Sequence, residues 1–186
     1  MKEWFQGKTV AIVGNAMSLF DKEYGSEIDS HDVVVRLNKA AMLYERYDAE
    51  KSHGKRTDVW MFWRTGEYKT TFRTIDKSVK KMHMSYQERN QPYTKECDFV
   101  YPDALHRALK TKVGKHNNPT TGIMAIDYVY SCDPAMISIY GFDWKETPTY
   151  TDPDRKAEKQ CFHDFPAEKQ YVHEFFLTKP NVFLRN

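Results

Sequence analysis

A chain of 186 residues is long enough for one well-buried domain and too short for two comfortable ones. Its formal net charge of +2 is too small to indicate a nucleic acid as the main partner, and no stretch approaches the ~20 apolar residues of a transmembrane helix. The first residues, MKEWFQGKTVAIVG, do not form a signal peptide, because Lys8 interrupts the apolar run.

Three cysteines, Cys97, Cys132 and Cys161, are odd in number and lack the CxxC spacing of a zinc site. This usage is typical of reduced thiols rather than a disulfide framework. We therefore expect a cytoplasmic protein.

Short apolar runs alternate with amphipathic segments along the chain. Thr9–Val13 is a β-branched run that ends at Gly14-Asn15, which predicts a buried strand meeting a turn. Ser18, with Asp21 three residues on, predicts a capping box and a short helix that ends near Gly25. Further strands are predicted at 32–37, 58–63, 79–84, 99–101, 136–140 and 182–184, and helices at 68–76, 103–109, 121–132 and 166–177. Residues 50–57, 111–119 and 147–155 read as loops.

Strands that alternate with helices indicate a parallel sheet covered on both faces. The sequence therefore predicts a single α/β, Rossmann-like domain over residues 1–186, with a mostly parallel sheet flanked by helices. Ligands of such sheets bind beyond the carboxyl ends of the strands. Gly14-Asn15, Asn38 and Gly141-Phe142-Asp143 fall there.

Thr120-Thr121-Gly122 opens a buried helix, where unpaired backbone N–H groups favour an anion. Glycine at this place would let a ligand approach the backbone closely. Taken alone, each of these features is more often an ordinary turn or helix cap than a binding site. Neither GxGxxG nor GxxxxGK[ST] is present in the sequence.

The order of the segments is more informative than any one of them. VAIVGNAMSLFDKEYGSEIDSHDVVVRLNKA (10–40) resembles the long sialyl motif of the family 29 glycosyltransferases, and HGKRTDVW (53–60) resembles its continuation. NPTTGIMAIDYVYSCDPAMISIYGFDW (118–144) is similar to the short motif, and His163 with Glu168 fits the very short motif His-x-x-x-x-Glu. The long-motif matches are Gly14, Asn15, Leu19, Ile28, Asp29, His31, Asp32, Val34, Arg36 and Asn38.

This resemblance implies a variant of the GT-A glycosyltransferase fold. It also implies transfer of sialic acid from CMP-sialic acid to a glycan hydroxyl, with inversion and without a metal or other cofactor. By the same resemblance, His163 would be the general base and Glu168 would support it. The donor would be bound by Gly14, Asn15, Asn38, Thr120, Thr121 and Gly122.

Three departures from the family pattern stand out. Val10 occupies the position where the family has a cysteine that pairs with the one at Cys132, which fits a reducing compartment. Ala16 replaces the usual serine after Asn15. A phosphate-contacting histidine is not visible, and Tyr150 is the nearest candidate to replace it.

Two other functions remain open. Asp152-Pro153-Asp154 is an Asp-x-Asp pair of the kind that holds Mn²⁺ or Mg²⁺ in metal-dependent glycosyltransferases, although it lies in a Thr/Pro turn. A non-catalytic nucleotide- or glycan-binding relative would also fit the missing histidine and the short chain. The sequence leaves the donor open between sialic acid and Kdo, which share a carboxylate and the CMP linkage.

Overall fold

The computed structural model describes residues 2–43, 49–63, 74–85, 92–114, 118–151 and 163–185. Within these ranges, seven strands form one fully parallel sheet in the order β5-β4-β3-β2-β1-β6-β7. The strands are β1 (Thr9–Val13), β2 (Val33–Leu37), β3 (Val59–Phe62), β4 (Lys80–His83), β5 (Phe99–Val100), β6 (Met136–Tyr140) and β7 (Val182–Arg185).

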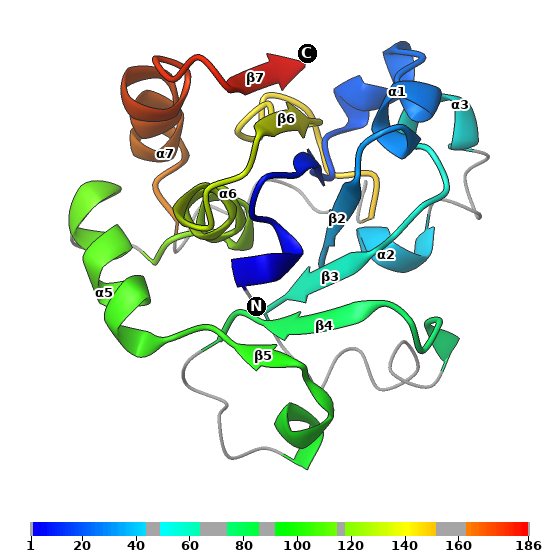
Figure 1. Ribbon diagram of the computed structural model, residues 1–186. Coiled ribbons are helices and arrows are strands. Elements are labelled where there is room, and N and C mark those ends of the chain that lie inside the picture. Colours follow the sequence, from blue (N-terminus) through cyan, green and yellow to red (C-terminus); the bar gives the residue numbers. More distant parts are fainter. Residues whose placement is uncertain are drawn as a thin grey trace.

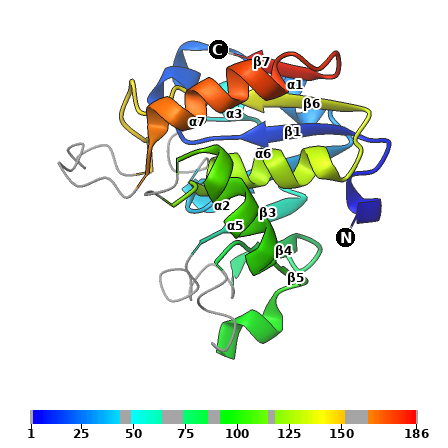
Figure 2. The same ribbon diagram turned by 90° about the vertical axis from the view of Figure 1, so that its left-hand side faces the viewer.

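Helices cover both faces of this sheet (Figures 1 and 2). One face carries α5 (Asp103–Lys112), α6 (Thr121–Ser131) and α7 (Phe165–Tyr171), which continues as the π-helix η7 (Val172–Phe176). The other face carries α1 (Gly25–Asp29), α2 (Ala40–Leu43) and α3 (Glu50–His53). Short 3-10 helices lie at Lys2–Trp4 (η1), Met17–Asp21 (η2) and Pro92–Glu96 (η6).

The core follows the alternation of side chains along the strands. Val10 and Ile12 of β1 belong to the larger apolar cluster, which includes most of α6. Ala11 and Val13 face the opposite way and pack with Ile28 of α1 in a smaller cluster. The predicted α/β, Rossmann-like architecture with a parallel sheet is therefore confirmed.

The capping box predicted at Ser18 is wrong. Met17–Asp21 forms a 3-10 helix whose N-cap is Ala16, with no side-chain cap, and the α-helix begins only at Gly25. The Ser18 hydroxyl instead donates to Asp143 Oδ2 (3.2 Å), in the turn after β6. The Ser18 hydroxyl is therefore bonded to a residue far along the chain and does not cap the local helix.

Two predicted loops are partly helical. Residues 50–53 form α3, because Arg36 Nη2 donates to the carbonyl of His53 (2.7 Å) and satisfies the end of that helix. α5 extends to Lys112, whose Nζ lies 3.5 Å from Asp127 Oδ1 on α6. The helix predicted at 68–76 lies almost entirely outside the described residues.

Candidate functional site

The strand order reverses between β1 and β6, because β2 to β5 extend to one side of β1 while β6 and β7 lie on the other. In open α/β sheets this switch point is where ligands bind, beyond the carboxyl ends of the strands. The two turns there are joined directly. Gly14 N–H donates to the Tyr140 carbonyl (2.8 Å), and Ala16 N–H donates to the Gly141 carbonyl (3.2 Å).

Two asparagines stand at this edge of the sheet. Asn38 follows β2 with a positive φ of 49°, which asparagine tolerates better than most residues. Its Oδ1 accepts the N–H of Trp63 (3.1 Å), so its NH₂ group points the other way as a donor. Asn15 follows β1, and its buried Oδ1 accepts no hydrogen bond from the part of the chain that the structure describes.

The start of α6 reaches the same edge, because this helix runs antiparallel to the strands. Thr120 caps it, with Oγ1 accepting the N–H of Ile123 (3.1 Å). Among the described residues, no acceptor is found for the N–H groups of Thr121 and Gly122. These two N–H groups and the positive end of the helix dipole can bind an anion.

Glu168 on α7 holds this helix start in place. Thr120 donates both its backbone N–H, to Oε1, and its hydroxyl, to Oε2, each at 2.7 Å. Burial raises the pKa of Glu168 to about 7, although the bonds from Thr120 oppose that shift. The donors of Thr120 are thus engaged inside the protein, and the N–H groups of the next two residues are left for a ligand.

His163 is fixed to the same segment. Its Nδ1 lies 2.7 Å from the carbonyl oxygen of Asn118, and a carbonyl can only accept, so Nδ1 carries a proton. In the neutral ring, Nε2 then carries the lone pair that a general base needs. The residues predicted from two separate motifs, His163 with Glu168 and Thr120 with its neighbours, therefore meet at one place.

Tyr150 is brought beside Asn15. Ala16 and Thr149 form an antiparallel bridge, and Tyr150 N–H donates to the Asn15 carbonyl (3.0 Å). The ring itself is 1% exposed and packs against Phe20 and His53, with centroids 5.5 and 4.7 Å away. Burial raises the pKa of its hydroxyl. In this arrangement the side chain faces the interior rather than the solvent.

Sequence reasoning placed Phe142 at the ligand edge but missed the contacts of its ring, which lies beside two of the predicted donor-binding glycines. A Cβ atom at Gly14 would come within 2.8 Å of the Cδ2 atom of this ring, and a Cβ atom at Gly122 within 2.7 Å of its Cε1 atom. The Tyr-Gly-Phe string is visible in the sequence, but nothing local indicates what the ring contacts.

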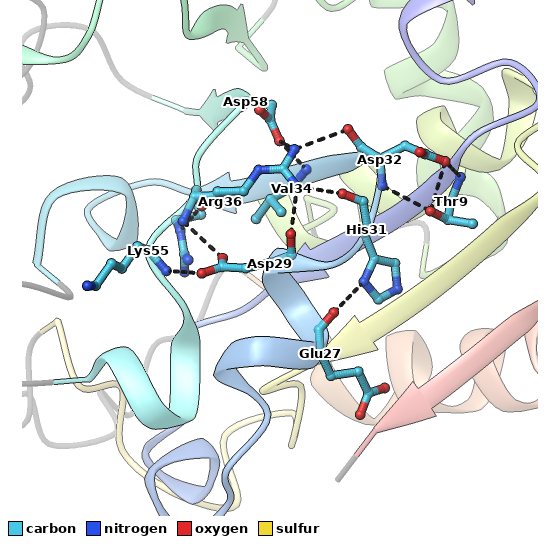
Figure 3. A network of polar contacts seen from close by, with 10 residues as sticks. Thr9, Glu27, Asp29, His31, Asp32, Val34, Arg36, Lys55 and Asp58 are labelled. Carbon is cyan, nitrogen blue, oxygen red and sulfur yellow. Dashed lines mark hydrogen bonds and ion pairs between the residues drawn. The ribbon is translucent and has the colours of Figure 1, made fainter.

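Other residues that match the long motif lie at the opposite edge of the sheet, around the starts of β1, β2 and β3 (Figure 3). The Arg56 guanidinium donates to the carbonyls of Asp29 and His31 (2.7 Å each) and to Asp58 Oδ2 (2.9 Å). Asp32 and Thr9 exchange bonds, with Thr9 N–H donating to Asp32 Oδ2 (2.8 Å) and Asp32 N–H donating to Thr9 Oγ1 (2.9 Å). These residues connect the strand starts to one another.

Within the described residues, no group of three or more histidine, cysteine or acidic side chains is arranged to hold a metal ion. The alternative metal pair, Asp152 and Asp154, lies outside the described residues, as does Cys161. Cys132 is a buried free cysteine. No helix in the described ranges is long and apolar enough to cross a membrane.

Polar groups from three separate segments thus surround the switch point of a doubly wound parallel sheet, with an anion-binding helix start among them. This fold and edge define a doubly wound α/β protein with a candidate ligand site at its switch point.

Comparison with known proteins narrows this class to a family. The profile described as glycosyltransferase family 29 (sialyltransferase) matches residues 5–104, more than half of the 186-residue chain. The chain therefore belongs to glycosyltransferase family 29.

Curated relatives agree with this family. A CMP-N-acetylneuraminate-β-galactosamide-α-2,3-sialyltransferase of Mus musculus is 26% identical over 158 residues, covering 71% of this chain and 44% of the relative. A β-1,6-galactosyltransferase of Arabidopsis thaliana is 43% identical over 49 residues, 26% of this chain and 11% of that protein. The chain thus spans less than half the length of the curated relatives it matches.

Solved structures share the fold. A mammalian sialyltransferase in complex with Gal-β-1-3GalNAc-ortho-nitrophenol has a TM-score of 0.69 at 20% identity, over 99% of this chain and 71% of that one. A monofunctional α-2,3-sialyltransferase from Campylobacter jejuni has a TM-score of 0.66 at 15% identity, over 96% and 75% of the two chains. The predicted resemblance to the sialyltransferase fold is confirmed.

Proposed function

We propose that this protein is an inverting, metal-independent glycosyltransferase, which moves a sialic-acid-like residue from a CMP-sugar to a glycan hydroxyl and acts as one domain. The observation that carries the proposal is the connection of His163 and Glu168 to residues 118–120, at the switch point of the sheet. It supports a base at His163 beside an anion site at the start of α6. Membership of family 29 supports the same reading.

In this proposal the donor lies across the edge formed by β1, β2 and α6. The NH₂ group of Asn38 and the N–H groups of Thr121 and Gly122 donate to the phosphate or the donor carboxylate. The buried Oδ1 of Asn15 needs a donor, which a ribose hydroxyl or a cytosine amino group can supply. Thr120 and Gly14 shape these turns, and Tyr150 lies beneath them.

His163 acts as the general base. The acceptor oxygen forms a bond to the anomeric carbon, while its proton passes to His163 Nε2. The bond from that carbon to the phosphate oxygen breaks, and CMP leaves with the electron pair. Asn118 helps this step, because its carbonyl accepts from Nδ1–H and stabilises the imidazolium that forms.

Two relatives bear on the donor. A sialyltransferase solved in complex with CMP shares the fold at 14% identity and a TM-score of 0.65. The Arabidopsis thaliana relative is named for galactose transfer. The donor screen therefore includes CMP-sialic acid, CMP-Kdo and a nucleotide-galactose.

The decisive experiment combines calorimetric titration of CMP with an assay of nucleotide release from each donor. We expect CMP to bind, CMP release to require a CMP-sugar and an acceptor, and EDTA to leave the rate unchanged. His163→Ala should lower kcat by about 10²–10⁴-fold while CMP affinity stays within about twofold. His173→Ala is the matched control, because His173 is exposed on η7.

Each alternative has its own outcome. Loss of turnover in EDTA would favour the metal-dependent mechanism with Asp152 and Asp154. CMP binding without turnover of any donor would indicate a non-catalytic relative. The proposal fails if neither His163→Ala nor Asn38→Ala changes turnover.

For location, we propose a reducing compartment such as the cytoplasm. Val10 stands where the family pattern has the partner cysteine, and the Cys132 thiol is free.

A further inference from the structure

The proposed donor site is assembled from turns that are distant in the chain. Gly14-Asn15 and Thr120–Gly122 are separated by more than a hundred residues, and a single donor must bridge them. Catalysis by positioning fails when such groups move by about 1 Å relative to one another. Something in the fold must therefore fix the distance between these two turns.

Phe142 lies between them. It follows Gly141, whose positive φ of 65° turns the chain at the end of β6. The Phe142 Cδ2 and Cε2 atoms face Gly14, at 2.8 and 2.9 Å from the position of a Cβ there. The Cε1 and Cζ atoms face Gly122, at 2.7 and 3.3 Å from the position of a Cβ. Different atoms of one ring thus contact Gly14 and the start of α6.

Neither contact leaves room for a methyl group, because real Cβ atoms essentially never approach another heavy atom within 3.0 Å. Glycine at position 122 is therefore required by Phe142, whether or not a ligand comes close to the backbone. At position 14 the carbonyl oxygen of Gly141 requires glycine as well.

We infer that Phe142 is a positioning residue, which sets the spacing of the two donor-binding turns by packing between Gly14 and Gly122. The inference rests on the proposed function for its effect on the donor, but not for the packing that it describes. It predicts that a larger side chain at position 122 is tolerated when the side chain at position 142 is shorter.

The test is a double-mutant cycle of Gly122→Ala and Phe142→Leu. Leucine lacks the Cε1 and Cζ atoms that the new methyl group would meet. Gly122→Ala alone should lower the melting temperature by roughly 3–10 °C through overpacking. In the Phe142→Leu background it should be neutral or stabilising, because alanine is the better helix former. CMP affinity should fall on the order of tenfold in Gly122→Ala and recover in the double variant.

Gly14→Ala provides the matched negative control. Its methyl group would also overlap the carbonyl oxygen of Gly141, which is backbone and is present in every variant. Phe142→Leu should therefore not rescue Gly14→Ala. Rescue of both glycine variants to the same extent would indicate general loosening of the edge and would overturn the inference.

Hydrogen exchange gives a readout that needs no ligand. Ala16 N–H donates to the Gly141 carbonyl (3.2 Å), so displacement of Phe142 should speed exchange at this amide in Gly122→Ala and not in the double variant. Absence of this pattern would overturn the inference even if CMP binds. Its presence in a protein that binds no CMP would support the spacing role and refute the proposed function. Stability rescue without recovery of CMP affinity would mean that Gly122 serves the ligand directly, which also overturns the inference.

Discussion

The two edges of the sheet are built from the same kinds of residue but differ in what those residues contact. At the amino edge, the carboxylate oxygens of Asp29 accept the N–H groups of Lys55 (2.8 Å) and Arg56 (3.0 Å). Asp58 Oδ2 accepts from Val34 N–H (2.8 Å) as well as from Arg56. At the carboxyl edge, the N–H groups of Thr121 and Gly122 and the Oδ1 of Asn15 have no partner among the described residues.

The residues of one motif are divided between the two edges. His31, Asp32 and Asn38 all fit the long sialyl motif, but only Asn38 lies at the ligand edge. His31 is 4% exposed, and its Nδ1 contacts the carbonyl of Glu27 (2.9 Å). The position of a matched residue along its strand is therefore a better guide to its role than the match itself.

The largest effect that tests the difference between the two edges is expected at Glu168. This residue lies at the carboxyl edge and holds Thr120 in place. Its pKa in the folded protein, about 7, lies above the ordinary value of 4.5. The carboxyl group of Glu168 therefore raises the free energy of unfolding by its full amount below pH 4.5, and this stabilisation is lost as the pH rises through about 7. The loss amounts to at most about 3 kcal/mol.

Glu168→Gln removes this titration. The free energy of unfolding of the wild type relative to Glu168→Gln should therefore fall between pH 4.5 and 7, as measured by urea denaturation across that range. Glu174→Gln is the matched control, because Glu174 is exposed and bonds only to Gln170 (2.9 Å) among the described residues. An unchanged difference between wild type and Glu168→Gln across this range would contradict the structural role.

A smaller effect is expected at the amino edge from Arg56→Met. The substitution removes the donors to Asp29, His31 and Asp58, and it should destabilise the protein by about 2 kcal/mol, since the side chain is partly exposed. CMP affinity and turnover of the folded variant should stay within about twofold. Thermal unfolding and CMP titration on the same sample measure both quantities.

Lys55→Met is the neighbouring control for Arg56→Met. The Lys55 side chain is 62% exposed and pairs with Glu50, so its loss should change stability by less than about 0.5 kcal/mol. The division between the two edges breaks down if Arg56→Met weakens CMP binding as strongly as Asn38→Ala does.

Most of the fold could be predicted because the strands are short, β-branched and buried. Thr9–Val13 and Met136–Tyr140 agree with the prediction to the residue, since each run ends at a glycine turn. The Ser18 capping box and the loop at 50–57 could not be predicted correctly. Both depend on partners far along the chain, Asp143 for Ser18 and Arg36 for α3.

The candidate site, like the fold, could be predicted from the sequence only in part. The helix start at Thr120 and the turn at Asn15 follow from local signals, and the motif order joined them to His163 and Glu168. What the sequence could not indicate was which donors are already used. Only the folded chain reveals that both donors of Thr120 point at Glu168, and that Phe142 fills the space beside Gly122.

The smallest expected effect concerns the cysteine thiols. Cys132 is 3% exposed in the same apolar cluster as Val10, and burial raises the pKa of its thiol, which keeps it protonated and unreactive. Burial likewise raises the pKa of Cys97. Dithiothreitol should therefore leave the melting temperature and CMP affinity unchanged. A clear drop in melting temperature would reveal a stabilising disulfide. If the drop persisted in Cys132→Ala, that disulfide would have to join Cys97 to Cys161, the two cysteines that remain.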